Sequence, residues 1–125
     1  MYQQDWLMRQ IQGIGDMLGA IIFQKADAAY KIQDEVNHTD TDVLYLRLAK
    51  LLADGKLCQA EDLLLEAMDP KNNDYLLVAL DFYQQLNDKT DEELAAGDFS
   101  RQEIEEGLTR VGKMVGLEGV CTYFG

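Results

Sequence analysis

The stretch LYLRLAKLLADGKLCQAEDLLLEAM, residues 44–68, decides the fold. Apolar side chains recur in it at steps of three and four residues, which is the spacing of one stripe along an α-helix. These stripes lie on both sides of Asp54-Gly55-Lys56 and comprise Leu44, Leu48, Leu51 and Leu52 before the turn and Leu57, Ala60, Leu64, Ala67 and Met68 after it. The pattern therefore predicts a helical hairpin over residues 43–69.

Residues 3–36 are predicted to form one N-terminal helix or a pair of helices. An apolar seam of Leu7, Ile11, Ile14, Leu18 and Ile21 is followed by a shifted apolar set of Ala28, Ile32 and Val36. An unbroken helix of this length would measure about 50 Å, whereas a domain of this size has a radius of gyration of about 14 Å. We therefore expect a bend near residues 25–27, or a helix that projects and pairs with a second copy of the chain.

Three glycines, Gly13, Gly15 and Gly19, lie within this N-terminal seam. Each lowers helix propensity by about 1 kcal/mol relative to alanine. The expected reason for their presence is the close approach of a neighbouring helix.

Residues 74–116 are predicted to hold the C-terminal helices. The first of them, residues 74–87, carries one apolar stripe of Leu76, Ala79, Leu80, Tyr83 and Leu86 and a second one of Tyr75, Val78 and Phe82. A helix that is apolar on two sides is covered on two sides. We therefore expect this helix inside the helical stack, between the hairpin and the elements that follow.

Two capping boxes mark the starts of the remaining helices. Thr90 with Glu93 predicts a short helical turn, and Ser100 with Glu103 predicts the start of the last long helix. In the tail, residues 117–125, the stretch from Val120 to Phe124 is β-branched and aromatic and is expected to lie extended over a groove. The whole chain of 125 residues fits a single all-α domain of about five to six helices.

The composition limits the classes of partner. Eleven basic and 23 acidic side chains give a formal net charge of -12. Such a field repels phosphate backbones and anionic lipid headgroups, so neither a nucleic acid nor a membrane is an expected partner. Asp5, Arg9 and Asp16 interrupt the apolar N-terminal residues, which argues against a signal peptide, and no run approaches the roughly 20 apolar residues of a membrane span. A cytoplasmic protein is expected.

The sequence offers few groups for catalysis or metal binding. His38 is the only histidine and lies in a polar loop, where a solvated side chain is the ordinary role. Cys58 and Cys121 match no metal-binding spacing, and Cys58 is expected to be a small buried thiol, with a disulfide as the less favoured alternative. Carboxylates crowd residues 91–106, where helix starts and solvent account for them. No catalytic residue, cofactor site or metal site is predicted.

A possible partner surface is predicted from the aromatic side chains. Tyr2 and Trp6 lie near the start of the N-terminal helix, and Tyr75, Phe82 and Tyr83 lie on the helix at residues 74–87. Packing in the core is the alternative role for the last three. For the N-terminal helix the alternatives are an internal cap on the stack and a seam for self-association.

The hairpin also carries a family resemblance. Leu44, Gly55, Ala60, Leu64 and Ala67 stand at the spacing of a tetratricopeptide repeat, and Ala28, Ile32 and Val36 echo Ala60, Leu64 and Met68 at an offset of 32 residues. Together with the opening DWLMRQI of residues 5–11, this pattern resembles a family of functionally uncharacterised, tetratricopeptide-like helical proteins from Firmicutes bacteria. The resemblance implies a right-handed stack of antiparallel helical hairpins and a cytoplasmic bacterial protein, and it brings no catalytic residue.

Three functional hypotheses follow from the sequence, of which the third, mimicry of a nucleic acid by acidic side chains, rests on the net charge alone. The first is a non-enzymatic protein–protein interaction or scaffold module that binds a protein or peptide partner, or a second copy through the N-terminal helix. The alternative is a small hydrolase or ligand-binding enzyme that uses clustered carboxylates at a helix junction. This alternative predicts carboxylates that are buried together in a pocket and have raised pKa values.

Overall fold

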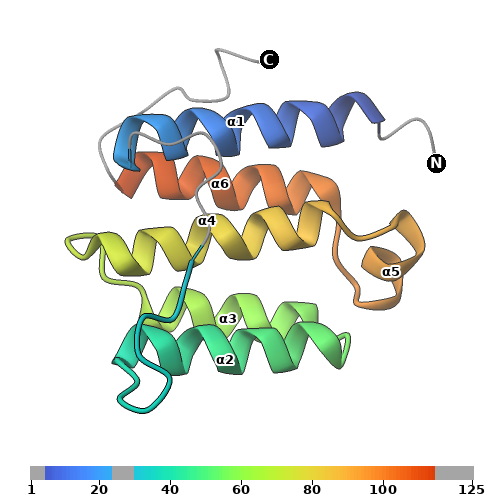
Figure 1. Ribbon diagram of the computed structural model, residues 1–125. Helices are drawn as coiled ribbons and strands as arrows, with labels where there is room; N and C mark the ends of the chain where they lie inside the picture. Colours follow the sequence, from blue (N-terminus) through green and yellow to red (C-terminus); the bar gives the residue numbers. More distant parts are fainter. Residues whose placement is uncertain (1–4, 24–29, 115–125) are drawn as a thin grey trace.

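The structure is a computed structural model that describes residues 5–23 and 30–114 (Figure 1). In these ranges the chain forms six α-helices and no strand, which confirms the prediction of an all-α protein with five to six helices. The helices are α1 (Asp5–Phe23), α2 (Asp40–Ala53), α3 (Leu57–Ala67), α4 (Asn73–Asn87), α5 (Asp91–Ala96) and α6 (Arg101–Met114).

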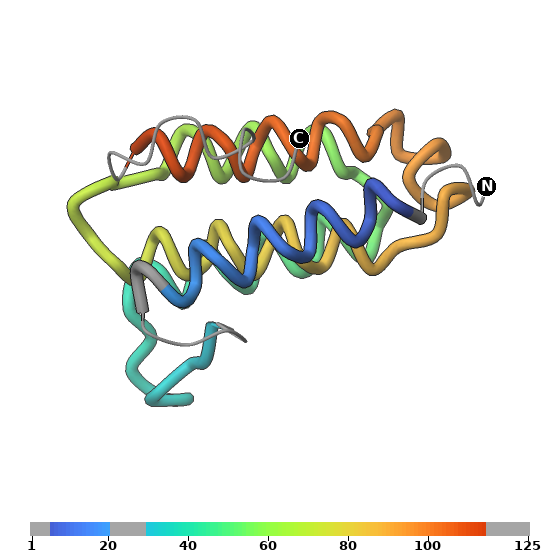
Figure 2. Tube along the Cα trace, turned by 90° about the horizontal axis from the view of Figure 1, so that it is seen from above, coloured from blue at the N-terminus to red at the C-terminus, as the bar shows by residue number. Residues whose placement is uncertain are grey.

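The five longer helices form two layers around α4. In Figure 1, α1 and α6 lie on one side of α4, and α2 and α3 lie on the other. The view from above in Figure 2 places α1, α4 and α2 in one layer and α6 and α3 in a second layer. The helix α4 contacts α1, α2 and α6, so the prediction of a helix covered on two sides is confirmed.

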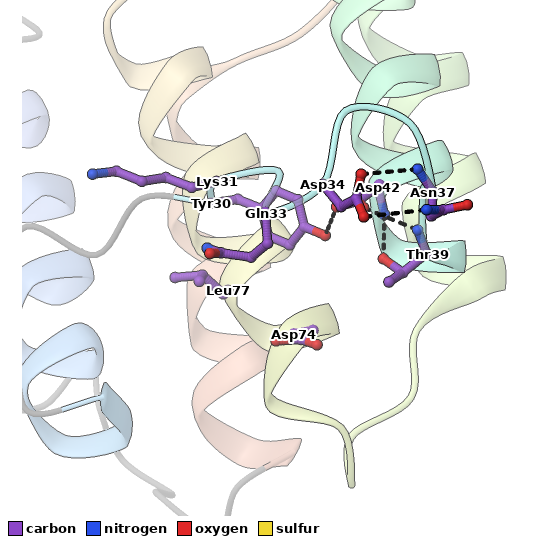
Figure 3. Close-up of a pocket in the computed structure, with 9 residues that line it drawn as sticks. All are labelled: Tyr30, Lys31, Gln33, Asp34, Asn37, Thr39, Asp42, Asp74 and Leu77. Carbon is purple, nitrogen blue, oxygen red and sulfur yellow. Dashed lines mark hydrogen bonds between the residues drawn. The ribbon is translucent and has the colours of Figure 1, made fainter.

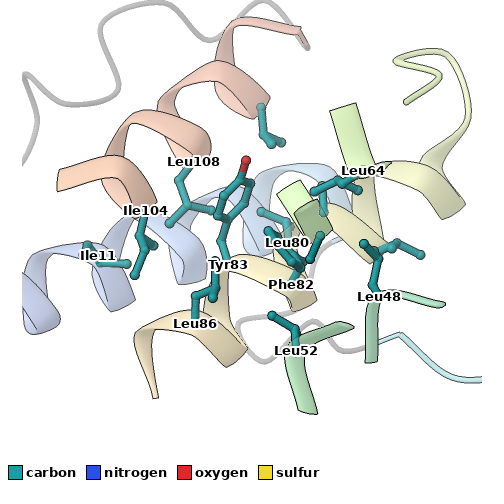
Figure 4. Close-up of a cluster of buried hydrophobic side chains, with 14 of the residues drawn as sticks. Ile11, Leu48, Leu52, Leu64, Leu80, Phe82, Tyr83, Leu86, Ile104 and Leu108 are labelled. Carbon is teal, nitrogen blue, oxygen red and sulfur yellow. The ribbon is translucent and has the colours of Figure 1, made fainter. Parts of the chain in front are cut away.

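The hydrophobic core gathers around α4, as Figure 4 shows. This helix buries seven apolar or aromatic side chains, namely Leu76, Val78, Ala79, Leu80, Phe82, Tyr83 and Leu86. Its neighbours supply Leu44, Leu48 and Leu52 from α2 and Ile104, Leu108 and Val111 from α6. Burial of this kind stabilises a fold by about 25 cal/mol for each Å² of apolar surface removed from water.

The predicted hairpin is formed by α2 and α3. Gly55 lies in the turn with a φ of 75°, a backbone conformation that favours glycine. Its N–H donates to the carbonyl of Leu52, and the Lys56 N–H donates to that of Leu51, which closes the end of α2. Leu57, Ala60 and Leu64 are the buried positions of α3.

The apolar seam of α1 faces the interior. Leu7, Ile11, Ile14 and Leu18 are buried where α1 packs on α4 and α6, and the Ile21 side chain lies outside the described set. A Cβ atom at Gly15 would lie 2.2 Å from the Nε2 atom of Gln84 on α4, so the expected close approach of a neighbouring helix is confirmed at this glycine. The four buried side chains of the seam thus pack within one chain, against α4 and α6. Self-association through the N-terminal helix stays a prediction.

The prediction of helix up to Val36 is wrong. Residues 30–39 are not helical, and the Val36 side chain is 86% exposed. The backbone N–H of Tyr30 donates to Oδ2 of Asp81 on α4 at 2.8 Å, and Asp34 Oδ1 accepts from the N–H groups of Val36 at 2.9 Å and Asn37 at 3.1 Å. Asp34 thus offers these N–H groups an alternative to helical hydrogen bonds.

Because residues 30–39 are not helical, the internal repeat predicted for the N-terminal segment is also wrong. Ile32 and Val36 do not occupy a helix, so they do not correspond to Leu64 and Met68 in structure. The expected bend at residues 25–27 lies outside the described residues. The short segment 30–39 instead connects to α2 along the side of the α2–α4 pair (Figure 1).

Both predicted capping boxes are present. The Thr90 side chain accepts from the Glu93 N–H while the Glu93 side chain accepts from the Thr90 N–H, which starts α5. Ser100 and Glu103 make the same reciprocal pair at the start of α6, with N···O distances of 3.1 and 3.2 Å. The predicted end of this helix near Val115 and the tail at residues 117–125 lie outside the described residues.

Candidate functional site

The structure separates the four described residues of the predicted partner surface. Phe82 and Tyr83 are buried in the core, so their placement in an open groove is wrong and the alternative of core packing holds. Tyr75 is half-buried and packs against that core, whereas Trp6 on α1 is 60% exposed. Tyr2 lies outside the described residues. The four described side chains therefore form no continuous surface.

The outer side of α2 carries two exposed apolar side chains that the sequence analysis did not single out. Val43 is 47% exposed and Leu46 is 42% exposed, and they lie three residues apart on one side of the helix. The signal was present in the sequence, because Leu44, Leu48 and Leu52 already complete the buried stripe and leave these two without an interior position.

Exposed polar and charged side chains of both signs lie on the same two-helix hairpin. Arg47 and Lys50 are exposed on α2, and Gln59, Asp62 and Glu66 are exposed on α3. By helical spacing they lie on the sides of α2 and α3 that face away from the buried stripes. We name as the hairpin face the set of Val43, Leu46, Arg47 and Lys50 on α2 and Gln59, Asp62 and Glu66 on α3. In Figure 1, α2 and α3 form the lower edge of the stack.

A polar pocket of about 230 Å³ lies between residues 30–39 and the starts of α2 and α4 (Figure 3). The Tyr30 hydroxyl donates to an Asp42 carboxylate oxygen and is 2.9 Å from the Thr41 hydroxyl. The hydrogen bond from Tyr30 holds the pKa of Asp42 below its usual range, and hydrogen bonds from the Asn37 and Val36 N–H groups do the same for the pKa of Asp34. Both carboxylates are therefore ionised at neutral pH. Asp42 fastens the segment to α2, whereas Asp34 closes a turn within the segment.

A second polar group lies between α3, α4 and α6. The Tyr83 hydroxyl donates to Glu61 Oε2 at 2.8 Å. Burial raises the pKa of Glu61, and this effect outweighs the Tyr83 hydrogen bond and the charge of Arg110, which lower the pKa. Burial and the neighbouring carboxylate raise the pKa of Tyr83, so its hydroxyl stays protonated. Glu61 is the one carboxylate among the described residues for which a raised pKa is found.

Cys58 and His38 are both exposed, which was predicted for His38 only. Cys58 is exposed, which contradicts the expected buried thiol, because Leu57 and Ala60 take the buried positions at the start of α3. Its Sγ atom lies 3.3 Å from the carbonyl oxygen of Asp98. His38 is exposed in the loop before α2, as predicted, and Cys121 lies outside the described residues.

Two properties of the described residues concern ligands and membranes. Within residues 5–23 and 30–114, no three His, Cys, Asp or Glu side chains are grouped in a way that could hold a metal ion. In the same ranges, no helix has both the length and the apolar character needed to cross a lipid bilayer.

Comparison with known proteins identifies the family. A family model described as a family of unknown function, DUF6483, matches residues 1–116. The chain therefore belongs to this family, in agreement with the expected resemblance to functionally uncharacterised proteins. No curated protein and no solved structure matches the chain.

Proposed function

We propose that this member of DUF6483 is a non-enzymatic protein–protein interaction module, and that its hairpin face binds the partner. The partner surface is thus moved from the predicted aromatic residues to α2 and α3. Tetratricopeptide-like stacking, a bacterial origin and a cytoplasmic location belong to the same proposal, and they rest on the sequence resemblance.

One observation carries the proposal. Val43 and Leu46 are two of the four large apolar side chains that are exposed in the described residues, and they lie on adjacent turns of one helix. Apolar side chains that cluster on an exposed surface, with polar groups at the rim, mark binding sites more often than isolated ones do. Arg47 and Lys50 supply such polar groups on the same helix.

The order of the helices supports a repeat architecture. Helix α2 begins at Asp40 and α4 begins at Asn73, so corresponding helices start 33 residues apart (73 − 40). Tetratricopeptide repeats have a period of about 34 residues, and each repeat is a helical hairpin. The second hairpin, α4 with α6, departs from that pattern because α5 is inserted in its connection. Stacked hairpins of this kind commonly serve as binding scaffolds.

The experiment that tests the proposal compares two matched variants. Val43→Asp places a negative charge on the hairpin face in the first turn of α2, and Gln102→Asp places one in the first turn of α6. A negative charge in the first turn is favourable to a helix, so both variants are expected to fold, which circular dichroism checks. Immobilised wild type, Val43→Asp and Gln102→Asp are then exposed to lysate, and bound proteins are quantified by mass spectrometry.

We expect at least one protein that wild type and Gln102→Asp bind in equal amounts. The amount of this protein bound by Val43→Asp is expected to be about tenfold lower. Retention of the same proteins by all three would contradict it.

The enzymatic alternative has one supporting observation, the raised pKa of Glu61. A carboxyl that holds its proton nearer to neutral pH is suited to general acid catalysis. The enzymatic hypothesis requires several carboxylates with raised pKa values in one pocket. Among the described residues, Glu61 has no second carboxylate of raised pKa beside it. We therefore place this function second.

A further inference from the structure

We propose that the hairpin face binds the hairpin face of a second copy of this chain, which gives a twofold-symmetric dimer. This inference rests on the proposed function and names the partner for it.

The charges on the hairpin face are separated by helix. Its basic side chains, Arg47 and Lys50, lie on α2, and its acidic side chains, Asp62 and Glu66, lie on α3. In the described part of the chain none of the four forms an ion pair. Their formal charges cancel (two positive and two negative), so this face is locally neutral on a chain whose net charge is -12. The face itself therefore adds no net repulsion to that between two copies of the chain.

The opposite charges also lie at similar distances from the turn. Arg47 is eight residues before Gly55, and Asp62 is seven residues after it. Because α2 and α3 form an antiparallel hairpin, these two side chains are almost level along the helix axes. Lys50 and Glu66 flank this level on either side.

Two twofold arrangements bring the hairpin faces together, and the charges favour one of them. An axis across the helices places α2 on the partner's α2 and α3 on the partner's α3, so like charges meet. An axis along the helices places α2 on the partner's α3, and each Arg47 then meets the level of Asp62 on the other copy. Like charges in an interface are costly and opposite charges set its register. The structure therefore points to the second arrangement.

The size of the face sets the expected affinity. Helices of 14 and 11 residues are about 21 and 17 Å long and about 10 Å wide, so the pair covers roughly 400 Å². This is about half of the 800 Å² per partner in a standard stable interface. We therefore expect a weak dimer with a dissociation constant in the micromolar range or above, which salt weakens further.

A charge exchange tests both the dimer and its arrangement. Arg47→Glu and Asp62→Arg each replace one exposed side chain of the hairpin face, and each places like charges opposite each other in its own homodimer. In an equimolar mixture of the two variants, both contacts of a mixed dimer again join opposite charges. Sedimentation equilibrium of wild type, each variant and the mixture, from about 1 µM to about 1 mM, measures the dissociation constants.

We expect wild type to dimerise, each variant to have a dissociation constant raised about tenfold or more, and the mixture to regain dimer. A wild type that stays monomeric to about 1 mM would overturn the inference, and so would a mixture that dimerises no better than its components. The proposed function fails separately, because it depends on whether Val43→Asp loses a protein that wild type retains. A monomeric wild type that still binds such a protein would disprove the dimer and keep the interaction module.

Discussion

At the scale of single residues, Gly107 shows how a glycine inside a helix makes room for a large side chain. A Cβ atom at this position of α6 would lie 2.2 Å from Cζ of Tyr83 on α4. Tyr83 is fully buried and its hydroxyl is held by Glu61, so the ring has no free space in which to move. The low helix propensity of this glycine is therefore tolerated because it lets α4 and α6 approach each other.

Gly107→Ala is predicted to destabilise the fold although alanine is the better helix former. We expect a loss of about 2–3 kcal/mol in the free energy of unfolding, measured by urea denaturation, because the added methyl group overpacks a full core. Gln102→Ala, at an exposed position of the same helix, is the control and is expected to change stability by less than about 0.5 kcal/mol.

A double variant separates the steric effect from a general effect on α6. Tyr83→Leu removes the ring that the new methyl group would meet. We expect Gly107→Ala to cost less in the Tyr83→Leu background than in wild type, since residues in contact are not additive. Equal costs in the two backgrounds would show that the ring is not the cause.

Glu61 gives a prediction for the dependence of stability on pH. Its pKa is raised in the folded chain, so its protonated form favours folding. This stabilisation is complete below the unfolded pKa of about 4.3 and is lost as the pH rises through the folded pKa. Glu61→Gln, which stays neutral, is therefore expected to raise the melting temperature by about 1–3 °C at pH 7 and to lose this advantage near pH 4.

Asp62→Asn is the control for this experiment, because it removes one negative charge from the neighbouring exposed position. It should show no comparable pH-dependent gain. If both variants changed the melting temperature in the same way, the effect would come from net charge and not from the burial of Glu61.

At the scale of elements, the segment 30–39 is fastened by hydrogen bonds rather than by helical structure. Tyr30 provides three contacts, which are its N–H to Asp81, its hydroxyl to Asp42 and Thr41, and its ring against Tyr45 at a centroid distance of 5.0 Å. The segment buries the Tyr30 side chain while Val36 stays in solvent. Tyr30 thus holds the connection to α2 in place through its backbone and its side chain, and Ile32 also packs against the core.

Tyr30→Phe is predicted to lower the melting temperature at neutral pH by a few degrees and to lower it less in acid. The hydrogen bond from Tyr30 lowers the pKa of Asp42, so its stabilisation is present above the unfolded pKa and is lost as the pH falls through the folded pKa. The two melting temperatures should therefore begin to converge as the pH falls below the unfolded pKa of about 3.9 and should meet below the folded pKa. A constant difference from pH 7 to pH 3 would contradict the role assigned to Asp42.

The helices themselves were largely predictable from the sequence, and the segment 30–39 was not. The α2–α3 hairpin, the two capping boxes and the two-sided α4 are local patterns of spacing and turn chemistry. Residues 30–39 depart from the helical pattern because Asp81, a residue 51 positions from Tyr30, fixes the backbone of Tyr30. Periodicity reports which side chains are apolar, and it does not report such distant hydrogen bonds.

The candidate site was less predictable than the fold for a related reason. Aromatic side chains in the sequence indicated a surface, but the position of α4 between two pairs of helices puts Phe82 and Tyr83 in the core. The hairpin face depends on which side of α2 is left uncovered, and this is decided by how α4 packs on it. Arg101 is a similar case, since its buried guanidinium binds the Asn87 and Lys89 carbonyls at the end of α4.

At the scale of the whole molecule, the net charge and the local charges of the proposed interface have opposite effects, because the net charge is repulsive and the charges of the hairpin face are expected to attract. The net charge of -12 on a small chain is a source of self-repulsion in the folded state. The proposed dimer, by contrast, depends on attraction between opposite charges of the hairpin face. The Debye length falls from about 10 Å at 0.1 M salt to about 3 Å at 1 M, so added salt weakens both effects.

Sodium chloride is therefore expected to raise the melting temperature while it reduces dimerisation. At about 5 µM protein, where a dimer of the expected affinity is largely dissociated, we predict a rise of a few degrees between about 20 mM and 0.5 M salt. At high protein concentration, sedimentation should show less dimer over the same range. Sodium chloride serves better than a sulfate salt, because sulfate also strengthens apolar burial and would raise the melting temperature without screening. A melting temperature that falls with salt at low protein concentration would mean that attractive pairs within one chain outweigh its net repulsion.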